Sequence, residues 1–209
     1  MDYLQKIRLE LTGVEKRYGM RRVLRDFSFV AEGGEVVAIT GANGSGKSTV
    51  VKLVAGLLRA SKGQISLQMG TTDESDPARR RLLCGYVSPD LTLYPELTAR
   101  ENLQFFCDVR GVSSENIATT LLRVGLGGRE DDPIGQDSSG LRQRVKLALA
   151  TLFSPPVLLH DEAGLALDDK GVAVVASLIA EQQARGGLTL IATNDDREVV
   201  LAERVIALS

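Results

Sequence analysis

The sequence predicts an α/β fold with a mixed-sheet core, an antiparallel β layer in its N-terminal part and an inserted helical lobe. Apolar and polar residues alternate at residues 7–11 and 27–30, a pattern typical of half-exposed antiparallel strands. A different layer begins at residues 36–40, an apolar run that leads through a glycine-rich turn into helical spacing at residues 48–58. Further along, two consecutive helical patterns interrupt the alternation of strand and helix. We therefore expect an inserted helical lobe at about residues 93–135.

The glycine-rich turn carries the most informative motif of the chain. Residues 41–48 match the phosphate-binding pattern G-x-x-x-x-G-K-[ST] at every specified position, between a predicted strand and a predicted helix. Its glycines allow successive backbone N–H groups to point at phosphate oxygens, and the helix N-terminus adds partial positive charge. We expect Lys47 to reach the β- and γ-phosphates and Ser48 to ligate Mg²⁺. The alternative is a structural turn with a lysine present by chance, although both flanks fit the motif.

Length and composition restrict the possible functions. A chain of 209 residues suits one α/β domain, which we expect to span residues 1–209. The balance of 25 Lys+Arg against 27 Asp+Glu provides no general basic field for binding nucleic acid. Cys84 and Cys107 lack CxxC spacing, so we expect reduced, buried thiols. No apolar core of a signal peptide and no apolar run of about 18 residues is found.

Three shorter stretches give local expectations. The charged residues 14–19 predict a turn between the first two strands. Three arginines at residues 79–81 indicate either a phosphate- or lipid-binding patch or a solvated helix face, and the balanced composition favours the helix face. Thr98 and Glu101 fit a capping box, with Thr98 as N-cap of a helix.

Two carboxylates follow a buried apolar strand at residues 157–160. Asp161 and Glu162 stand where that strand ends, and ligands of open α/β sheets bind at this edge. They are either a solvated strand end or, given the phosphate loop, an Asp that organises Mg²⁺ and a Glu that orients water. We prefer the second interpretation. His160, the only histidine, is expected to be a structural residue with satisfied hydrogen bonds rather than a catalytic one.

The order of these motifs resembles the ATP-binding subunit of ABC transporters, over essentially the whole chain. Residues 41–48 are similar to the Walker A loop of that family, and residues 157–162 to its Walker B strand with the adjoining glutamate. Residues 138–140 resemble the core of its signature sequence, and residues 167–168 the end of its D-loop. Tyr18 falls where the family stacks an aromatic ring on adenine. The resemblance implies a P-loop NTPase fold of the ABC type.

A narrower resemblance points to the ATP-binding subunit of the haem exporter used in cytochrome c maturation. It rests on the short length, on residues 204–208 near the end of the chain and on residues 169–172.

The chain departs from the family pattern at several positions. Pro89 replaces the Q-loop glutamine, and Asn194 stands where the switch histidine belongs. Asp137 and Leu141 replace the usual leucine and glutamine at the two ends of the signature, and Leu165 replaces the common D-loop serine. These changes leave ATP binding intact but bear on the rate and coupling of hydrolysis.

The resemblance implies a head-to-tail dimer, with a homodimer as the expected form. Each ATP would lie between residues 41–49 of one chain and residues 138–140 of the other, and an integral membrane transporter subunit would be the second partner. The implied location is cytoplasmic, at the inner face of the cell membrane. Hydrolysis would open the dimer and so move the membrane subunit. The alternative is a catalytically weak regulatory or assembly module of the same fold, which the missing glutamine and histidine favour and the retained Glu162 opposes.

The site residues implied by the resemblance fall into three groups. For catalysis they are Glu162, which polarises water, Lys47, which stabilises developing charge, and Asn194 at the switch position. For Mg²⁺ they are Ser48 and Asp161. For nucleotide binding they are Tyr18, Gly41, Ala42, Asn43, Gly44, Ser45, Gly46, Lys47, Ser48, Thr49, Ser138, Ser139 and Gly140.

Overall fold

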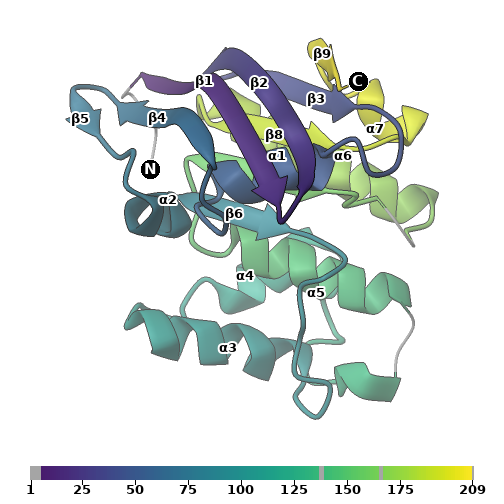
Figure 1. Cartoon of the computed structure of the whole chain (residues 1–209). Coiled ribbons are helices and arrows are strands. Elements are labelled where there is room, and N and C mark those ends of the chain that lie inside the picture. Colours follow the sequence, from purple (N-terminus) through teal and green to yellow (C-terminus); the bar gives the residue numbers. More distant parts are fainter. Residues whose placement is uncertain (1–5, 137–138, 165–166, 209) are drawn as a thin grey trace.

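The structure is a computed structural model that describes residues 6–136, 139–164 and 167–208. Asp137, Ser138 and Leu165, which the sequence singled out, lie outside the described residues. The described part of the chain forms two β-sheets and a group of helices (Figure 1). Among the described residues, no helix is both long enough and apolar enough to span a bilayer.

The first sheet is antiparallel and has the strand order β2-β1-β4-β5. Its strands are β1 (Ile7–Tyr18), β2 (Arg21–Glu32), β4 (Lys62–Met69) and β5 (Thr72–Asp73). Alternate residues of β1 are buried, as the alternating sequence pattern predicts for a sheet with one face on the core. The predicted antiparallel layer is therefore present, and it is longer than expected.

The turn expected at residues 14–19 is wrong, because β1 continues to Tyr18. Gly13 has a positive φ of 60°, and the register between β1 and β2 shifts between Leu11 and Val14. Such a bulge inserts extra residues and turns the following ones, so that Val14 returns to the core and is fully buried. The charged residues within 14–18 that suggested a turn are therefore part of a bulged strand.

The second sheet is parallel throughout and has the order β6-β7-β8-β3-β9. Its strands are β3 (Val36–Thr40), β6 (Cys84–Val87), β7 (Val157–Asp161), β8 (Leu188–Ala192) and β9 (Arg204–Ala207). Every residue of β7 and β8 is buried, as expected for strands covered on both faces. Parallel strands end at one edge, so the segments that follow β3, β7 and β8 meet there.

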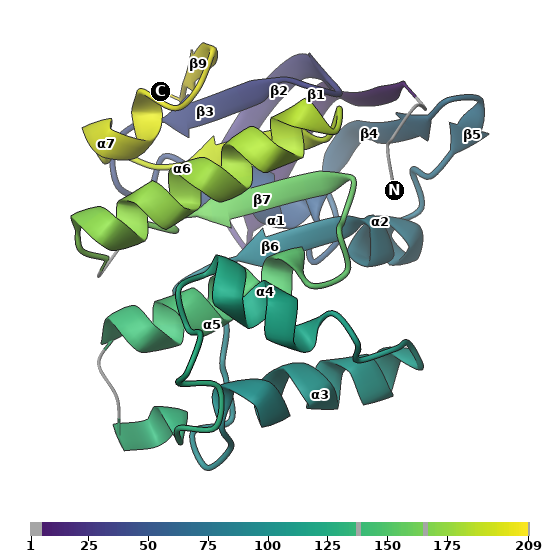
Figure 2. The same ribbon diagram turned by 180° about the vertical axis from the view of Figure 1, so that it is seen from behind.

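Helices cover both faces of the parallel sheet. One face packs on α1 (Lys47–Val54), which shares a core with residues of β1 and β3. The other face packs on α5 (Ser139–Thr151) and α6 (Asp169–Ala184), which belong to a second core (Figure 2). The sheet thus separates two hydrophobic cores, and α1 carries the phosphate loop at its N-terminus.

Further helices lie between β6 and α5 in the chain. They are α3 (Ala99–Arg110), α4 (Ile117–Arg123) and the 3₁₀ turn η1 (Ile134–Gln136), and α3 and α4 pack near α5 at the lower side of Figure 1. The capping box predicted for α3 is confirmed: Thr98 Oγ1 accepts from the N–H of Glu101 at 3.1 Å, and Glu101 Oε2 accepts from the N–H of Thr98 at 2.9 Å. The two short remaining helices are α2 (Pro77–Leu83) and α7 (Asp196–Val199).

The prediction of a solvated arginine face at residues 79–81 is wrong for Arg80. Its side chain is 3% exposed and donates to backbone carbonyls, including those of Leu53 and Val54 at the end of α1. Burial lowers the pKa of Arg80 below its ordinary value. The side chain therefore supplies further donors to carbonyls in the last turn of α1, where intrahelical donors run out.

The predicted thiols are confirmed as free and buried. Cys84 lies in β6 and Cys107 in α3. Burial raises the pKa of the Cys84 thiol to about 12, so it stays protonated and unreactive.

Candidate nucleotide-binding site

The phosphate loop curls tightly at two glycines. Gly41 has φ 143° and Gly46 has φ 108°, conformations that side chains with a Cβ rarely adopt. A Cβ on Gly46 would lie 2.8 Å from Leu24 Cδ2, and one on Gly41 would lie 2.5 Å from the carbonyl oxygen of Leu208. Both positions therefore require glycine, and the loop delivers the chain into α1 at Lys47.

Lys47 spans the mouth of this loop. Its Nζ donates to the carbonyl oxygen of Gly41 at 2.7 Å and to that of Ala42 at 3.4 Å, and the residue is 6% exposed. The ammonium group thus lies beside the N-terminus of α1, where the helix dipole and unpaired N–H groups also favour an anion. This combination suits a phosphate group.

Ser48 and Asp161 lie in direct contact. Ser48 Oγ donates to Asp161 Oδ1 at 2.7 Å, and Asp161 Oδ2 accepts from the hydroxyl of Tyr86 at 3.1 Å. Asp161 ends β7 and is 3% exposed, whereas Ser48 belongs to the first turn of α1. A hydroxyl and a carboxylate are hard oxygen donors of the kind that Mg²⁺ prefers, so these two residues fit that ion.

Glu162 follows Asp161 in an unusual backbone conformation. Its φ is 53°, in the left-handed region, and its N–H donates to the carbonyl oxygen of Ala192 at 2.9 Å. A non-glycine residue here carries strain that surrounding structure must hold, and such strain clusters at functional sites. The Glu162 side chain lines the same hollow as Lys47 and Ser48.

Asn194 lies against the phosphate loop from the end of β8. Its Oδ1 accepts from the N–H of Gly41 at 3.3 Å, and its Nδ2 donates to Asn43 Oδ1 at 3.4 Å. Asn194 and Glu162 also line one small hollow together with Asn43. The residue at the predicted switch position is therefore adjacent to the loop and to the second carboxylate.

We call the cavity above these groups the phosphate-loop hollow; its volume is about 460 Å³. Tyr18 lies at its edge, 47% exposed, with Lys16 Nζ 5.1 Å from the ring centroid. The hollow brings together these sequence-predicted residues: Tyr18, Asn43, Gly44, Gly46, Lys47, Ser48, Thr49 and Glu162. An exposed ring at the edge of a phosphate site is placed to stack on a base.

The signature residues lie elsewhere. Ser139 and Gly140, at the start of α5, line a different hollow of about 570 Å³ together with Arg144 and Asp168. We call it the signature hollow. Among the described residues, it shares no lining residue with the phosphate-loop hollow, so within one chain the structure does not bring Ser139 and Gly140 to the phosphate loop. Ser45 likewise faces another hollow, beside Arg21 and Leu208.

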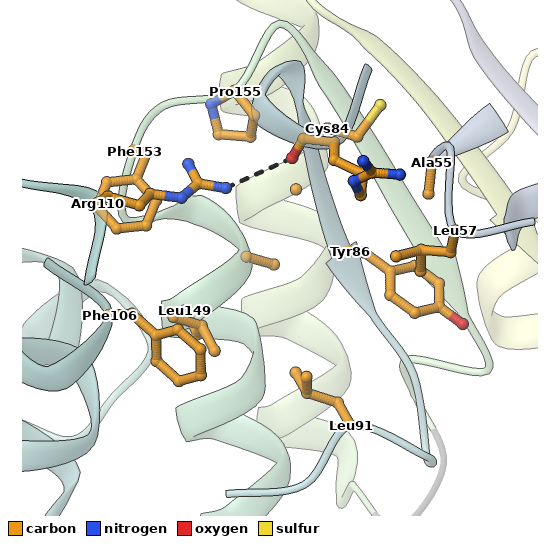
Figure 3. A pocket seen from close by; sticks show the side chains of 13 residues that line it. Ala55, Leu57, Cys84, Tyr86, Leu91, Phe106, Arg110, Leu149, Phe153 and Pro155 are labelled. Atoms are coloured by element: carbon orange, nitrogen blue, oxygen red, sulfur yellow. Dashed lines mark hydrogen bonds between the residues drawn. The ribbon is translucent and has the colours of Figure 1, made fainter. Parts of the chain in front are cut away.

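A further cavity, which we call the apolar groove, is lined by residues of β6, α3 and α5, among others (Figure 3). Its volume is about 300 Å³. Arg110 stands at one end, with its guanidinium 4.3 Å from the ring centroid of Phe153. The apolar side chains that line the groove include Leu57, Tyr86, Leu91, Phe106, Leu149 and Phe153.

His160 takes no part in these sites. It is fully buried, and neither ring nitrogen has a hydrogen-bond partner among the described residues. Burial lowers the pKa of His160 to about 4. The histidine is therefore neutral at physiological pH. The prediction of a structural histidine with satisfied hydrogen bonds is wrong in its second part, because the ring lies in the core without a partner for either nitrogen among the described residues.

A sequence profile described as ABC transporter matches residues 24–164, which is more than half of the chain. The chain belongs to the ABC transporter family. The profile covers the phosphate loop and both carboxylates, Asp161 and Glu162. In this ABC protein Tyr18 and Asn194 fall outside the matched range, and the structure independently places both beside the phosphate loop.

Known proteins agree with this family. The ABC protein is 34% identical over 191 residues to the cytochrome c biogenesis ATP-binding export protein CcmA of Vibrio parahaemolyticus, covering 90% of this chain and 92% of CcmA. It is 30% identical over 191 residues to the lantibiotic transport ATP-binding protein SrtF of Streptococcus pyogenes, covering 91% of this chain and 82% of SrtF. The narrower resemblance to a subunit of cytochrome c maturation agrees with the CcmA match.

Solved structures agree as well. An ATP-binding subunit of an ABC transporter superposes with a TM-score of 0.83 at 30% identity, covering 96% of this chain and 85% of the other. A dimeric, post-hydrolysis form of the ATP-binding cassette MJ0796, bound to ADP and Pi, superposes with a TM-score of 0.82 at 26% identity, covering 96% and 94%. The predicted fold class is confirmed, and the chain is an ATP-binding subunit of the ABC type, in a family of ATPases.

Two residues of this ABC subunit were missed by sequence reasoning. Arg21 lines the phosphate-loop hollow and pairs with Tyr18 across the β1–β2 hairpin. Tyr86 contacts Asp161 from the neighbouring strand β6. The hairpin pairing would have revealed Arg21 once β1 was correctly extended to Tyr18, whereas the contact of Tyr86 depends on the order of strands and has no local signal.

Proposed function

We propose that this chain binds Mg-ATP in the phosphate-loop hollow and hydrolyses it at Glu162 to power a membrane transporter. The observation that supports this proposal most directly is the contact of Ser48 with Asp161, at 2.7 Å, in a hollow that Lys47 and Glu162 also line. A phosphate-binding cation, a pair of metal-ligating oxygens and a second carboxylate are the parts that phosphoryl transfer to water requires.

Each side chain has a role that follows from its chemistry. Lys47 compensates the charge of the β- and γ-phosphates and the charge that develops during transfer. Ser48 and Asp161 hold Mg²⁺, which supplies further neutralisation of the phosphate oxygens. Glu162 orients and polarises the attacking water, and Tyr18 stacks on the base. Asn194 contacts the loop and senses the γ-phosphate through its amide, which carries no charge.

The separation of the two hollows supports a dimer. A nucleotide held by the phosphate loop of one chain gains contacts from Ser139 and Gly140 only if a second chain presents its signature hollow. We propose a head-to-tail homodimer of single-domain chains, each with a helical lobe at residues 93–135. The dimeric form of MJ0796, bound to ADP and Pi, is a precedent with the same fold.

The partner in the membrane is proposed to contact the apolar groove. The groove is lined by Leu57, Leu91 and Phe106, and also by Arg81 and Arg110. We expect an apolar segment of the membrane subunit with a carboxylate that faces these arginines, because the charges are complementary. The subunit would then act at the cytoplasmic face of the cell membrane, and the names of CcmA and SrtF associate relatives with export and transport.

A second candidate is a weak ATPase module whose bound nucleotide closes the dimer but turns over slowly. Asn194 and Pro89 favour it, because an amide and a proline replace the histidine and glutamine expected from the resemblance. The Glu162 carboxylate on the phosphate-loop hollow favours the active enzyme. Rates, rather than binding, separate the two candidates.

The decisive experiment replaces Glu162 by Gln and measures mass by size-exclusion chromatography with light scattering in Mg-ATP. We expect an ATP-trapped dimer without turnover, because the amide keeps the size of the carboxylate but not its charge. Glu115→Gln, on an exposed residue of the helical lobe, is the matched control and is expected to behave as the parent. Hydrolysis by Glu162→Gln at the parent's rate would exclude Glu162 as the catalytic carboxylate.

A further inference from the structure

Tyr86 reaches two functional regions at once. It lies in β6, where it is paired with Leu159 of β7, and its ring lines the apolar groove. In Figure 3 the hydroxyl of Tyr86 points away from Phe106 and Leu149. That hydroxyl is 3.1 Å from Asp161 Oδ2. One side chain therefore joins the groove wall to the carboxylate that we assign to Mg²⁺.

The two oxygens of Asp161 receive different donors. Ser48 donates to Oδ1 and Tyr86 to Oδ2, so the rotation of the carboxylate about its bond to Cβ is fixed from both sides. A buried carboxylate needs such partners, because leaving an oxygen without a donor costs free energy. The phenol hydroxyl of Tyr86 supplies the O–H donor that Oδ2 needs.

The strand that carries Tyr86 is anchored at its end. Lys146 Nζ, from α5, donates to the carbonyl oxygens of Ser88 at 3.2 Å and Pro89 at 2.7 Å. Lys52 Nζ, from α1, donates to Asp90 Oδ2 at 2.8 Å. The turn after β6 is thus held to the helix of the phosphate loop and to the helix of the signature residues, which limits the movement of Tyr86.

We propose that Tyr86 is a positioning residue that holds Asp161 in its metal-binding orientation. Groups that hydrogen-bond to metal-ligating side chains orient those ligands, and their removal commonly lowers metal affinity. The inference deepens the proposed function, since it requires that Asp161 serve Mg²⁺. Tyr86 is not among the described residues that line the phosphate-loop hollow, so its removal is expected to change metal binding and to leave metal-free nucleotide binding unaltered.

The test uses Tyr86→Phe, which removes only the hydroxyl and keeps the ring in the groove wall. Mn²⁺ binding is measured by electron paramagnetic resonance with saturating ADP, so that no turnover occurs, and the Kd of ADP is measured separately in EDTA. We expect Mn²⁺ affinity to fall by about tenfold and the Kd in EDTA to stay at the parent's value. Tyr94→Phe is the matched control, because Tyr94 packs on Phe105 in the helical lobe.

The outcomes are separable. Equal Mn²⁺ affinity in Tyr86→Phe and the parent overturns the role of Tyr86, and so does an equal loss of affinity with and without metal, which would indicate a structural role only. If the parent with ADP binds no Mn²⁺, the proposed function itself fails. A loss confined to metal binding, absent from Tyr94→Phe, supports the inference.

Discussion

The side-chain oxygen of Asn194 accepts a hydrogen bond from the backbone N–H of Gly41, with 3.3 Å between the two atoms. This contact ties the segment after β8 to the first residue of the phosphate loop after β3, and the two strands are neighbours in the parallel sheet. The asparagine amide accepts this bond through its oxygen and can donate through its nitrogen, but it cannot become a cation. Its position makes the residue a direct test of the catalytic mechanism.

Asn194→His is expected to preserve or raise ATP turnover. An imidazole that becomes protonated near the γ-phosphate adds positive charge where the amide offers only a dipole. The measurement is steady-state phosphate release at saturating Mg-ATP, for the parent and the variant, each against its own Glu162→Gln control. Turnover that stays at the control level in both proteins would favour the weak-module candidate.

Lys47→Ala is expected to weaken ATP binding by about 100-fold while leaving the fold unchanged. The variant loses hydrogen bonds between a cation and phosphate, each worth about 1.5–3 kcal/mol. Isothermal titration calorimetry gives the Kd, and Lys62→Ala, on an exposed residue of β4, is the control for removal of a lysine. An unchanged Kd for Lys47→Ala would refute the assignment of the phosphate-loop hollow.

Tyr18→Ala is expected to weaken nucleotide binding by roughly 1–3 kcal/mol, the range for stacking of an aromatic ring on a base. The loss of affinity should be equal for ATP and GTP, because the face of an aromatic ring does not contact the edge of the base. Tyr18→Phe is the control, since it keeps the ring that Lys16 contacts. A large loss for one nucleotide alone would show that Tyr18 has a different role.

His160→Leu is expected to remove part of the acid sensitivity of the fold. Burial lowers the pKa of His160 from 6.5 to about 4, so between these values the unfolded chain binds a proton that the folded chain does not. Stability therefore falls as the pH drops through this interval, and at neutral pH the contribution is absent. Near the folded pKa the effect is on the order of 3 kcal/mol.

Urea titrations of parent and His160→Leu across that interval give the free energy of unfolding. The difference between the two proteins isolates His160, since carboxylates titrate in both. Parallel pH profiles would show that His160 is accessible to protons in the folded state.

Much of the fold and site could be predicted because the decisive signals are local. The loop at residues 41–48 specifies glycine, lysine and serine within one turn, and Asp161 and Glu162 directly follow an apolar strand. Parallel topology then brings these segments to one edge. The family and fold class are confirmed, while the roles of individual site residues remain predictions.

What the sequence could not predict depends on distant partners. Three adjacent arginines resemble a solvated run, yet Arg80 is buried because carbonyls at the end of α1 lie within its reach. The contact of Tyr86 with Asp161 joins residues far apart in the chain and requires that β6 and β7 be neighbours. A local pattern contains no such information.

The side chain of Lys146 binds main-chain atoms of the turn after β6, namely the carbonyl oxygens of Ser88 and Pro89. Every amino acid supplies a carbonyl, whereas only a long cationic side chain supplies this donor. Of these two residues in contact, Pro89 is therefore expected to tolerate substitution better than Lys146. For this contact, residue 89 can be any amino acid. Residue 146, on helix α5, must carry the long cationic side chain that holds the turn.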